Sequence, residues 1–229
     1  MKTLKDFLKR KNKKNSLIIC SGSSPNDKIQ NIKKFIKENK KEFDIFGINN
    51  IHPEFRKYID YHCFTNTQRF KKYGKYIDLK NSELLLGKNI NNNIRKKVLN
   101  GFDDYFNIEY IDIEKTKIDY DNGKVEGFFR TCGCLMIYIS YLMKHENIFI
   151  IGMDGYTLYN EDILEDEKKS QHWYGQGLTD TTTYKTCAQK DILIYDVLNN
   201  LKHQNINFKI LTSTLYKDFC DLNILKELK

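Results

Sequence analysis

The sequence predicts an α/β protein with a Rossmann-like, mostly parallel and doubly wound sheet that carries a small inserted lid. Short apolar runs alternate with helical segments along most of the chain, which is the pattern of a parallel sheet covered by helices. Several of these runs end on Asn, Ser or Thr, and the carboxyl ends of parallel strands form the ligand crevice of such a fold. The first run leads through a loop of small residues into a helix, as a first Rossmann-like unit does.

Length and composition limit the classes of protein to which the chain can belong. A chain of 229 residues with 40% hydrophobic and 13% aromatic residues is expected to fold as one globular domain. We place this domain at residues 16–229, with the lid at about 157–180, behind a basic N-terminal arm at 1–15. No apolar run approaches the roughly 18 residues of a transmembrane helix, and the first residues lack the apolar core of a signal peptide. The six cysteines include no Cys-x-x-Cys pair, so we expect reduced thiols and a cytoplasmic location.

The net charge of +8 comes mainly from residues 1–15, which hold seven Lys or Arg residues and one Asp and carry +6. Only +2 remains for the rest of the chain, which lacks the concentrated basic face that nucleic-acid binding requires, so we expect no nucleic-acid partner. The arm is expected to be solvated. Because Leu4, Phe7 and Leu8 share one face of a short helix, peripheral contact with the inner membrane is the alternative.

The elements follow in order along the chain. Strands are expected at residues 16–20, 43–49, 61–66, 82–87, 148–151 and 206–211. Helices are expected at 28–39, 133–144 and 188–203, and a last helix should follow the final strand. Suitable caps are Ser24 or Asn26 for the first of these helices, Thr131 for the second, and Ser213 or Thr214 for the last.

The loop after the first strand is a candidate phosphate site. Ser21, Gly22 and Ser23 precede a helix, where backbone amides and the helix dipole favour an anion. The loop is neither a G-x-G-x-x-G nor a Walker sequence, so a plain turn remains the alternative.

Asparagines follow the next two strands. Asn49 and Asn50 end one strand and Asn66 ends another, where their amides could contact a nucleotide. Each could equally be an ordinary turn residue. Cys132 and Cys134 have no second ligand pair beside them, so we expect no metal site.

The segment after the central strand reads as the rim of an active site. Asp154, Tyr156 and Tyr159 follow its last residues, and Asp154 is expected to organise the loop rather than touch a substrate. A long irregular stretch comes next, and loops of that length in a compact domain are usually functional. It contains His172 beside Trp173, a candidate general base, although a solvated histidine and surface tyrosines are the simpler interpretations.

Together these motifs resemble the bacterial lipooligosaccharide sialyltransferases of glycosyltransferase family 42. The shared features are the small-residue loop, the strand-end asparagines, the Arg-Thr-x-Gly, Gly-x-Asp-x-Tyr and His-x-Tyr sequences, and the final Ser/Thr after the last strand at Ser213. A related Rossmann-like domain of unknown function, fused to aldolase-type barrels, is also similar. The resemblance covers roughly residues 16–220.

The resemblance implies a metal-free, inverting transfer of a sialic-acid-like sugar from a CMP-sugar, with no cofactor, to a cell-surface glycan acceptor. It implies His172 as the base, Tyr156 and Tyr159 as donors to the leaving phosphate, and Arg130, Thr131 and Gly133 at the donor's edge. The asparagines, the first loop and Ser213 would also contact the donor. Ser21 stands where the family has a donor-contacting asparagine, and the lid is shorter.

Two function classes therefore stay open. One is a CMP-sugar-dependent glycosyltransferase of lipooligosaccharide or capsule synthesis. The other is a Rossmann-like nucleotide-binding domain without that activity, either pyrophosphokinase-like or an accessory partner of a sugar-synthesis enzyme. The altered first loop and the short lid favour the second class. A homo-oligomer is compatible with either.

Overall fold

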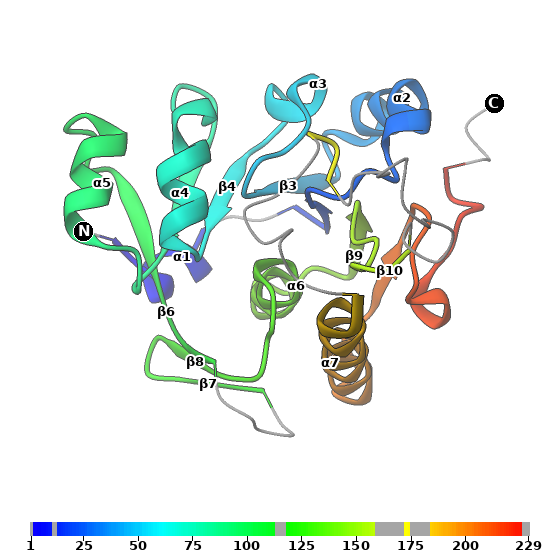
Figure 1. The fold of residues 1–229 in the computed structure, drawn as a ribbon. Helices are drawn as coiled ribbons and strands as arrows, with labels where there is room; N and C mark the ends of the chain where they lie inside the picture. The colour runs from blue at the N-terminus through cyan, green and yellow to red at the C-terminus, as the bar shows by residue number, and fades with distance from the viewer. Residues whose placement is uncertain (1, 11–12, 113–117, 159–171, 175–183, 226–229) are drawn as a thin grey trace.

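The computed structural model describes residues 2–10, 13–112, 118–158, 172–174 and 184–225 (Figure 1). These residues form an α/β fold around one ten-stranded, mostly parallel sheet, as the sequence predicts. The strands are β1 (Lys2–Thr3), β2 (Asn15–Ile19), β3 (Phe43–Ile48), β4 (Tyr61–Phe64), β5 (Glu83–Gly87), β6 (Tyr105–Asp112), β7 (Asp119–Asp121), β8 (Lys124–Gly127), β9 (Asn147–Ile151) and β10 (Phe208–Ile210).

The strand order places a topological switch beside β2. The order is β10-β9-β2-β3-β4-β5-β6-β8-β7, with β1 on β6, and among the described residues only the β7–β8 pair is antiparallel. The chain runs outward from β2 to β6 and later returns to add β9 and β10 on the other side of β2. In open α/β sheets the ligand crevice forms at the carboxyl ends of the strands where the direction of winding reverses. Here that point is the gap between the ends of β2 and β9.

Helices cover both faces of the sheet. The helices are α1 (Leu4–Leu8), α2 (Ile29–Asn39), α3 (Pro53–Arg56), α4 (Thr67–Tyr73), α5 (Asn92–Leu99), α6 (Cys132–Leu142) and α7 (Tyr184–His203). Figure 1 shows α2 to α5 on one face and α6 and α7 on the other. This is the doubly wound arrangement expected from the sequence.

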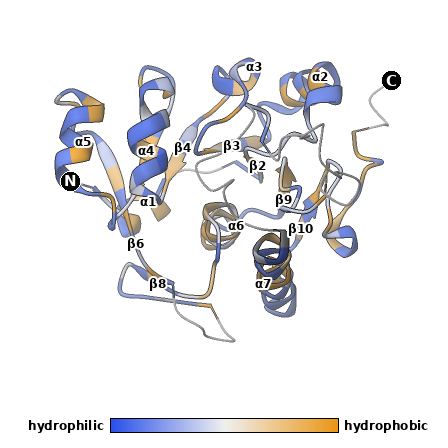
Figure 2. Cartoon of the chain, in the orientation of Figure 1, coloured by the Kyte–Doolittle hydropathy of each residue, from blue (hydrophilic) through white to orange (hydrophobic). Residues whose placement is uncertain are grey.

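Both faces of the central strands are buried, which explains why these strands read as continuous apolar runs. On β2, Ile18 packs in the cluster that contains α6 and α7, whereas Leu17 and Ile19 pack in the cluster that contains α2. Every residue of α6 from Cys132 to Ser140 is buried. Figure 2 shows the corresponding hydrophobic colour around α6, while the outer sides of α4 and α5 are largely hydrophilic.

The N-terminal segment belongs to the fold, which corrects the expectation of a solvated basic arm. β1 pairs in parallel with β6, and Thr3 caps α1 by accepting a hydrogen bond from the Asp6 amide. Leu4 and Phe7 are 1% and 0% exposed, and the Phe7 ring meets Phe106 edge-on at 5.1 Å. The apolar face that could have contacted a membrane therefore faces the core.

Two other expectations about the elements need correction. Neither Ser24 nor Asn26 caps α2, because Lys28 precedes this helix without a side-chain cap. The last helix is only a short 3₁₀ turn at Lys217–Phe219, without a side-chain cap from Ser213 or Thr214. Residues 88–107, for which the sequence predicted no element, contain α5 and the start of β6. Most of the predicted lid at 157–180 lies outside the described residues.

Candidate functional site

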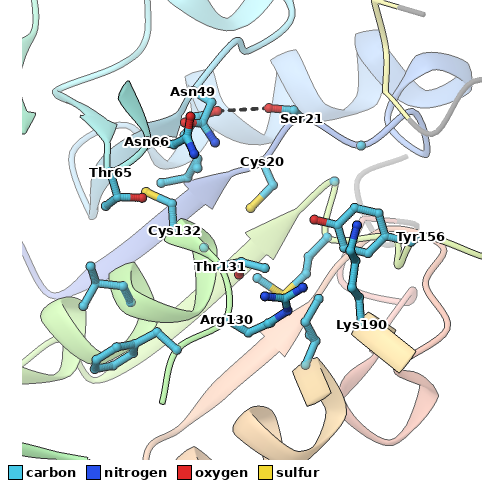
Figure 3. A pocket seen from close by; sticks show the side chains of 18 of the residues that line it. Cys20, Ser21, Asn49, Thr65, Asn66, Arg130, Thr131, Cys132, Tyr156 and Lys190 are labelled. Atoms are coloured by element: carbon cyan, nitrogen blue, oxygen red, sulfur yellow. Dashed lines mark hydrogen bonds between the residues drawn. The ribbon is translucent and has the colours of Figure 1, made fainter. Parts of the chain in front are cut away.

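A cavity of about 400 Å³ lies at the carboxyl ends of the central strands (Figure 3). It occupies the topological switch, because residues that follow β2, β3, β4 and β9 all line it. Ten of the residues predicted for the site line this cavity: Ser21, Gly22, Asn49, Asn66, Arg130, Thr131, Gly133, Asp154, Tyr156 and His172. The structure thus brings together most of a set that is scattered over the sequence.

Asp154 organises the first loop, as its position after the central strand suggested. Its carboxylate accepts hydrogen bonds from the amide and the hydroxyl of Ser24, the amide bond being 2.8 Å long. Asp154 is 3% exposed, and burial raises the pKa of its carboxyl to about 6 despite the opposing hydrogen bonds from Ser24 and Ser23. Ser24 therefore fixes the loop by its hydrogen bonds to Asp154, and it does not cap α2.

Two glycines allow the loops after β2 and β9 to meet. The Gly22 amide donates to the Gly152 carbonyl at 3.0 Å, and a Cβ on Gly22 would lie 2.5 Å from the Asp154 side chain. Gly152 has φ +72°, a left-handed conformation that glycine adopts without steric cost. A larger residue at either position would separate the loops that enclose one side of the cavity.

The Arg-Thr-x-Gly segment directs the beginning of α6 at the cavity. Arg130 has φ 58°, which is uncommon for a residue other than glycine. Thr131 caps α6 as predicted, because its hydroxyl accepts from the Cys134 amide at 3.2 Å. Thr131 and Gly133 both line the cavity, so the positive end of the helix dipole borders it.

Asp191 on α7 fixes the loop that carries Tyr156. Its carboxylate accepts from the amides of Tyr156 and Thr157, at 2.7 and 2.9 Å, and from the Thr157 hydroxyl at 2.9 Å. The hydroxyl of Tyr216 donates to the same carboxylate at 2.9 Å. Burial raises the pKa of Tyr156, so its phenol stays protonated and able to donate a hydrogen bond at neutral pH.

His172 docks against the first loop. It forms an antiparallel bridge with Gly22, and the next residue, Trp173, donates from its amide to the Ser21 carbonyl at 3.2 Å. The Trp173 indole donates to the Asn50 carbonyl at 2.7 Å, and the His172 ring stacks on Tyr174 at 4.9 Å. These contacts hold the His-x-Tyr segment over the loop after β2, with His172 at the cavity.

Asn49 is held in an unusual conformation at the end of β3. It has φ 55°, and its carbonyl lies 2.6 Å from Nε2 of the buried His62. Burial lowers the pKa of His62 to about 4, so this ring is neutral near pH 7 and Nε2 acts as the donor. The Oδ1 atom of Asn49 is buried without a hydrogen-bond partner among the described residues. A buried acceptor without a donor suits a ligand's N–H group.

Four predicted residues do not line the cavity as described. Ser23 and Asn50 are not among its lining residues, and the Asn50 carbonyl instead accepts the hydrogen bond from the Trp173 indole. Ser213 is exposed, while its neighbours Thr212 and Thr214 hold the loop after β9 by bonds to the Gly152 amide and the Met153 carbonyl. Tyr159 lies outside the described residues.

Sequence reasoning missed two cations of the cavity, Arg69 and Lys190. Arg69 lies on the first turn of α4, just after Asn66, whose side chain accepts from the Arg69 amide at 3.0 Å. Lys190 lies on α7, next to Asp191. The position of Arg69 after a strand-end asparagine was a signal that could have found it. Nothing in the sequence pattern connects Lys190 to the site.

Sequence reasoning also missed an Asp-x-Asp pair at Asp119 and Asp121, whose carboxylates share one face of β7. This pair lies in a separate surface pocket with Glu109 and Glu126 and does not line the cavity. Among the described residues, no group of three or more His, Cys, Asp or Glu side chains is placed to hold a metal ion.

Comparison with protein-family models and with curated protein sequences yields no match. The resemblance to the sialyltransferases therefore rests on the motifs alone. Within the described parts of the chain, no helix has both the length and the apolar character needed to cross a bilayer.

Proposed function

We propose that the protein is a metal-independent, inverting glycosyltransferase that moves a sialic-acid-like sugar from a CMP-sugar to a hydroxyl group of a cell-surface glycan. One observation carries the proposal: His172, Tyr156 and Arg130, which are distant in the sequence, line the same cavity at the switch between β2 and β9. The transfer needs a base for the acceptor hydroxyl and groups that stabilise the departing phosphate. The imidazole can supply the first, and the phenol and the guanidinium can supply the second.

In the proposed reaction the acceptor oxygen attacks the anomeric carbon while the bond from that carbon to the phosphate oxygen breaks. His172 takes the proton of the acceptor hydroxyl, a role that suits an imidazole near neutral pH. CMP leaves with the bonding electron pair, and the Tyr156 hydroxyl donates to the phosphate as its charge grows. The Arg130 guanidinium favours the same charge.

A donor-hydrolysis assay tests this proposal. Purified protein given CMP-sialic acid in the presence of a metal chelator should release CMP slowly. His172→Ala should abolish the release while the affinity for CMP stays unchanged, because His172 acts on the acceptor side. His203→Ala is the matched control, since His203 is exposed at the end of α7. Equal CMP release by wild type and His172→Ala would contradict the assignment of His172.

The second candidate is a nucleotide-binding Rossmann-like domain without transferase activity. The observation that favours it is Ser21, which replaces the donor-contacting asparagine of the resembling family and whose hydroxyl donates to the Ile48 carbonyl at 3.1 Å (Figure 3). In the same assay this candidate would bind a nucleotide and release no CMP from any CMP-sugar.

We place the reaction in the cytoplasm, because thiols stay reduced there. The protein would meet its CMP-sugar donor in the same compartment. All six cysteines lie among the described residues, and none forms a disulfide there. The acceptor would then be presented at the inner face of the membrane.

A further inference from the structure

Three cationic side chains from three separate elements line the cavity. Arg69 comes from α4, Arg130 from the turn before α6, and Lys190 from α7. Lys190 Nζ lies 5.2 Å from the centre of the Tyr156 ring. Figure 3 shows Lys190 beside Tyr156, and Arg130 on the same side of the cavity.

Both arginines act electrostatically on the same phenol. The positive charges of Arg69 and Arg130 lower the pKa of Tyr156, against the larger effect of burial. Lys190 over the ring and the two arginines through their charge thus all act on Tyr156, which lines the cavity.

Among the side chains that the structure describes, none pairs with these cations to neutralise their charge. Among the described residues, no salt bridge joins Arg69, Arg130 or Lys190 to a carboxylate. The two acids that line the cavity serve other donors. Asp154 binds Ser24, and Asp112 accepts from the Phe129 amide at 3.0 Å. Cations that line one cavity repel one another, and a bound anion relieves that repulsion.

The backbone also supports a binding site here. Arg130 is held at φ 58°, a sparsely populated conformation for a residue other than glycine that clusters at functional sites. The first turn of the eleven-residue helix α6 borders the same space through Gly133. Helix amino ends and oriented amides attract phosphate groups.

We propose that Arg69, Arg130 and Lys190, with the Tyr156 hydroxyl, form an anion subsite that binds the phosphate group of a nucleotide. The subsite extends the proposed function by naming the residues that bind the donor phosphate. It rests on that function only for the identity of the nucleoside. Arg69 and Lys190 are binding residues of this subsite, and they supply two of its three positive charges.

Calorimetric titration with CMP and with cytidine tests the subsite. Lys190→Met and Arg69→Met should each weaken CMP binding about tenfold or more, because each removes a charge-assisted contact to phosphate. Cytidine has no phosphate, so its affinity should stay within about twofold of the wild-type value. Lys190→Arg, which keeps the charge, should retain CMP affinity within about threefold. Equal CMP affinity in wild type and Lys190→Met would overturn the proposal, as would an equal loss for cytidine.

Lys185→Met and Lys71→Met are the matched controls. Lys185 lies on α7 and Lys71 on α4, both are exposed, and neither lines the cavity. Both variants should bind CMP as the wild type does. Thermal unfolding of every variant should show an unchanged midpoint, which confirms that the affinity changes arise at the site.

Further ligands separate a failure of the subsite from a failure of the proposed function. If UMP, AMP or inorganic phosphate binds with the same dependence on Lys190 while CMP does not bind, the subsite stands and the CMP-sugar donor is wrong. If CMP is released from CMP-sialic acid equally by wild type and Lys190→Met, and both bind CMP equally, the transferase stands and the subsite is wrong. If neither a nucleotide nor phosphate binds the wild type, the subsite is overturned.

Discussion

The Asp154 carboxylate binds both the backbone amide and the hydroxyl of Ser24, a residue 130 positions earlier in the chain. This contact ties the loop after β9 to the loop after β2, directly across the topological switch. The shape of the first loop therefore depends on a side chain from the other half of the sheet. A Rossmann-like site without the usual glycine-rich sequence is held in shape here by this contact and by the close approach of Gly22 and Gly152.

The first prediction concerns the contribution of Asp154 to the free energy of unfolding and how that contribution changes with pH. Its folded-state pKa of about 6 lies above the ordinary value of 3.8, so the neutral carboxyl stabilises the fold below about pH 4. That contribution is lost as the pH rises through about 6. A shift of about two units corresponds to roughly 3 kcal/mol in the free energy of unfolding.

Asp154→Asn isolates this effect, because asparagine remains neutral and can still bond both Ser24 groups. The unfolding free energy of the variant relative to wild type should rise by about 3 kcal/mol between pH 4 and pH 7. Urea unfolding at several pH values measures the difference. Parallel curves for the two proteins would show that Asp154 keeps an ordinary pKa.

The second prediction concerns Asp191. In Asp191→Asn the new side-chain NH₂ group is itself a donor. It would face N–H or O–H groups whose hydrogen bonds the carboxylate accepts in the wild type. We expect a loss of about 2 kcal/mol in the free energy of unfolding and weaker binding of CMP, because the Tyr156 loop loses its anchor. Asp196→Asn, at an exposed position on the same helix, is the control and should change neither quantity. Wild-type nucleotide affinity in Asp191→Asn would mean that the loop is held by other contacts.

The third prediction separates stability from binding. His145 lies at the opposite end of the sheet, where Nε2 is 3.0 Å from the buried Asp44 carboxylate and Nδ1 is 3.0 Å from the Ser140 carbonyl. His145→Ala leaves Asp44 buried with only its Lys13 contacts and should cost about 3 kcal/mol in unfolding free energy. Affinity for CMP, measured below the unfolding transition, should not change. A loss of affinity would show coupling between the two ends of the sheet.

The fourth prediction tests the corrected position of the N-terminal segment. Phe7→Ala should lower the free energy of unfolding by about 3 kcal/mol, because the ring is fully buried between α1 and the sheet. Lys5→Ala, on the exposed side of α1, should cost less than about 0.5 kcal/mol. If chemical denaturation finds the two variants equally stable, residues 2–10 do not pack as the structure shows.

The sequence was sufficient for the central strands and their helices because apolar runs and helical segments report directly on burial, whereas β1, β6, β7 and β8 were not predicted. The strands β2, β3, β5 and β9 and the helix α6 were predicted within about two residues of their observed limits. The N-terminal segment was misassigned because its charge is obvious in the sequence, whereas the burial of Leu4 and Phe7 depends on β6, which lies about a hundred residues away.

The site was predictable where its residues follow strands directly. Asn49, Asn66, Asp154 and Tyr156 all do so, and the parallel sheet places strand ends together. Lys190 was not predictable, because it comes from the middle of a long helix whose position over the cavity depends on tertiary packing. The loop anchor Asp191 was missed for the same reason.

The most direct measurement is a crystal structure of the protein with bound CMP. We predict that the nucleotide occupies the cavity between the ends of β2 and β9. Its phosphate should lie within hydrogen-bonding distance of Tyr156 and Lys190, and His172 should face the part of the cavity that the nucleotide leaves for an acceptor. CMP bound elsewhere on the molecule, with this cavity empty at saturating nucleotide, would contradict the account.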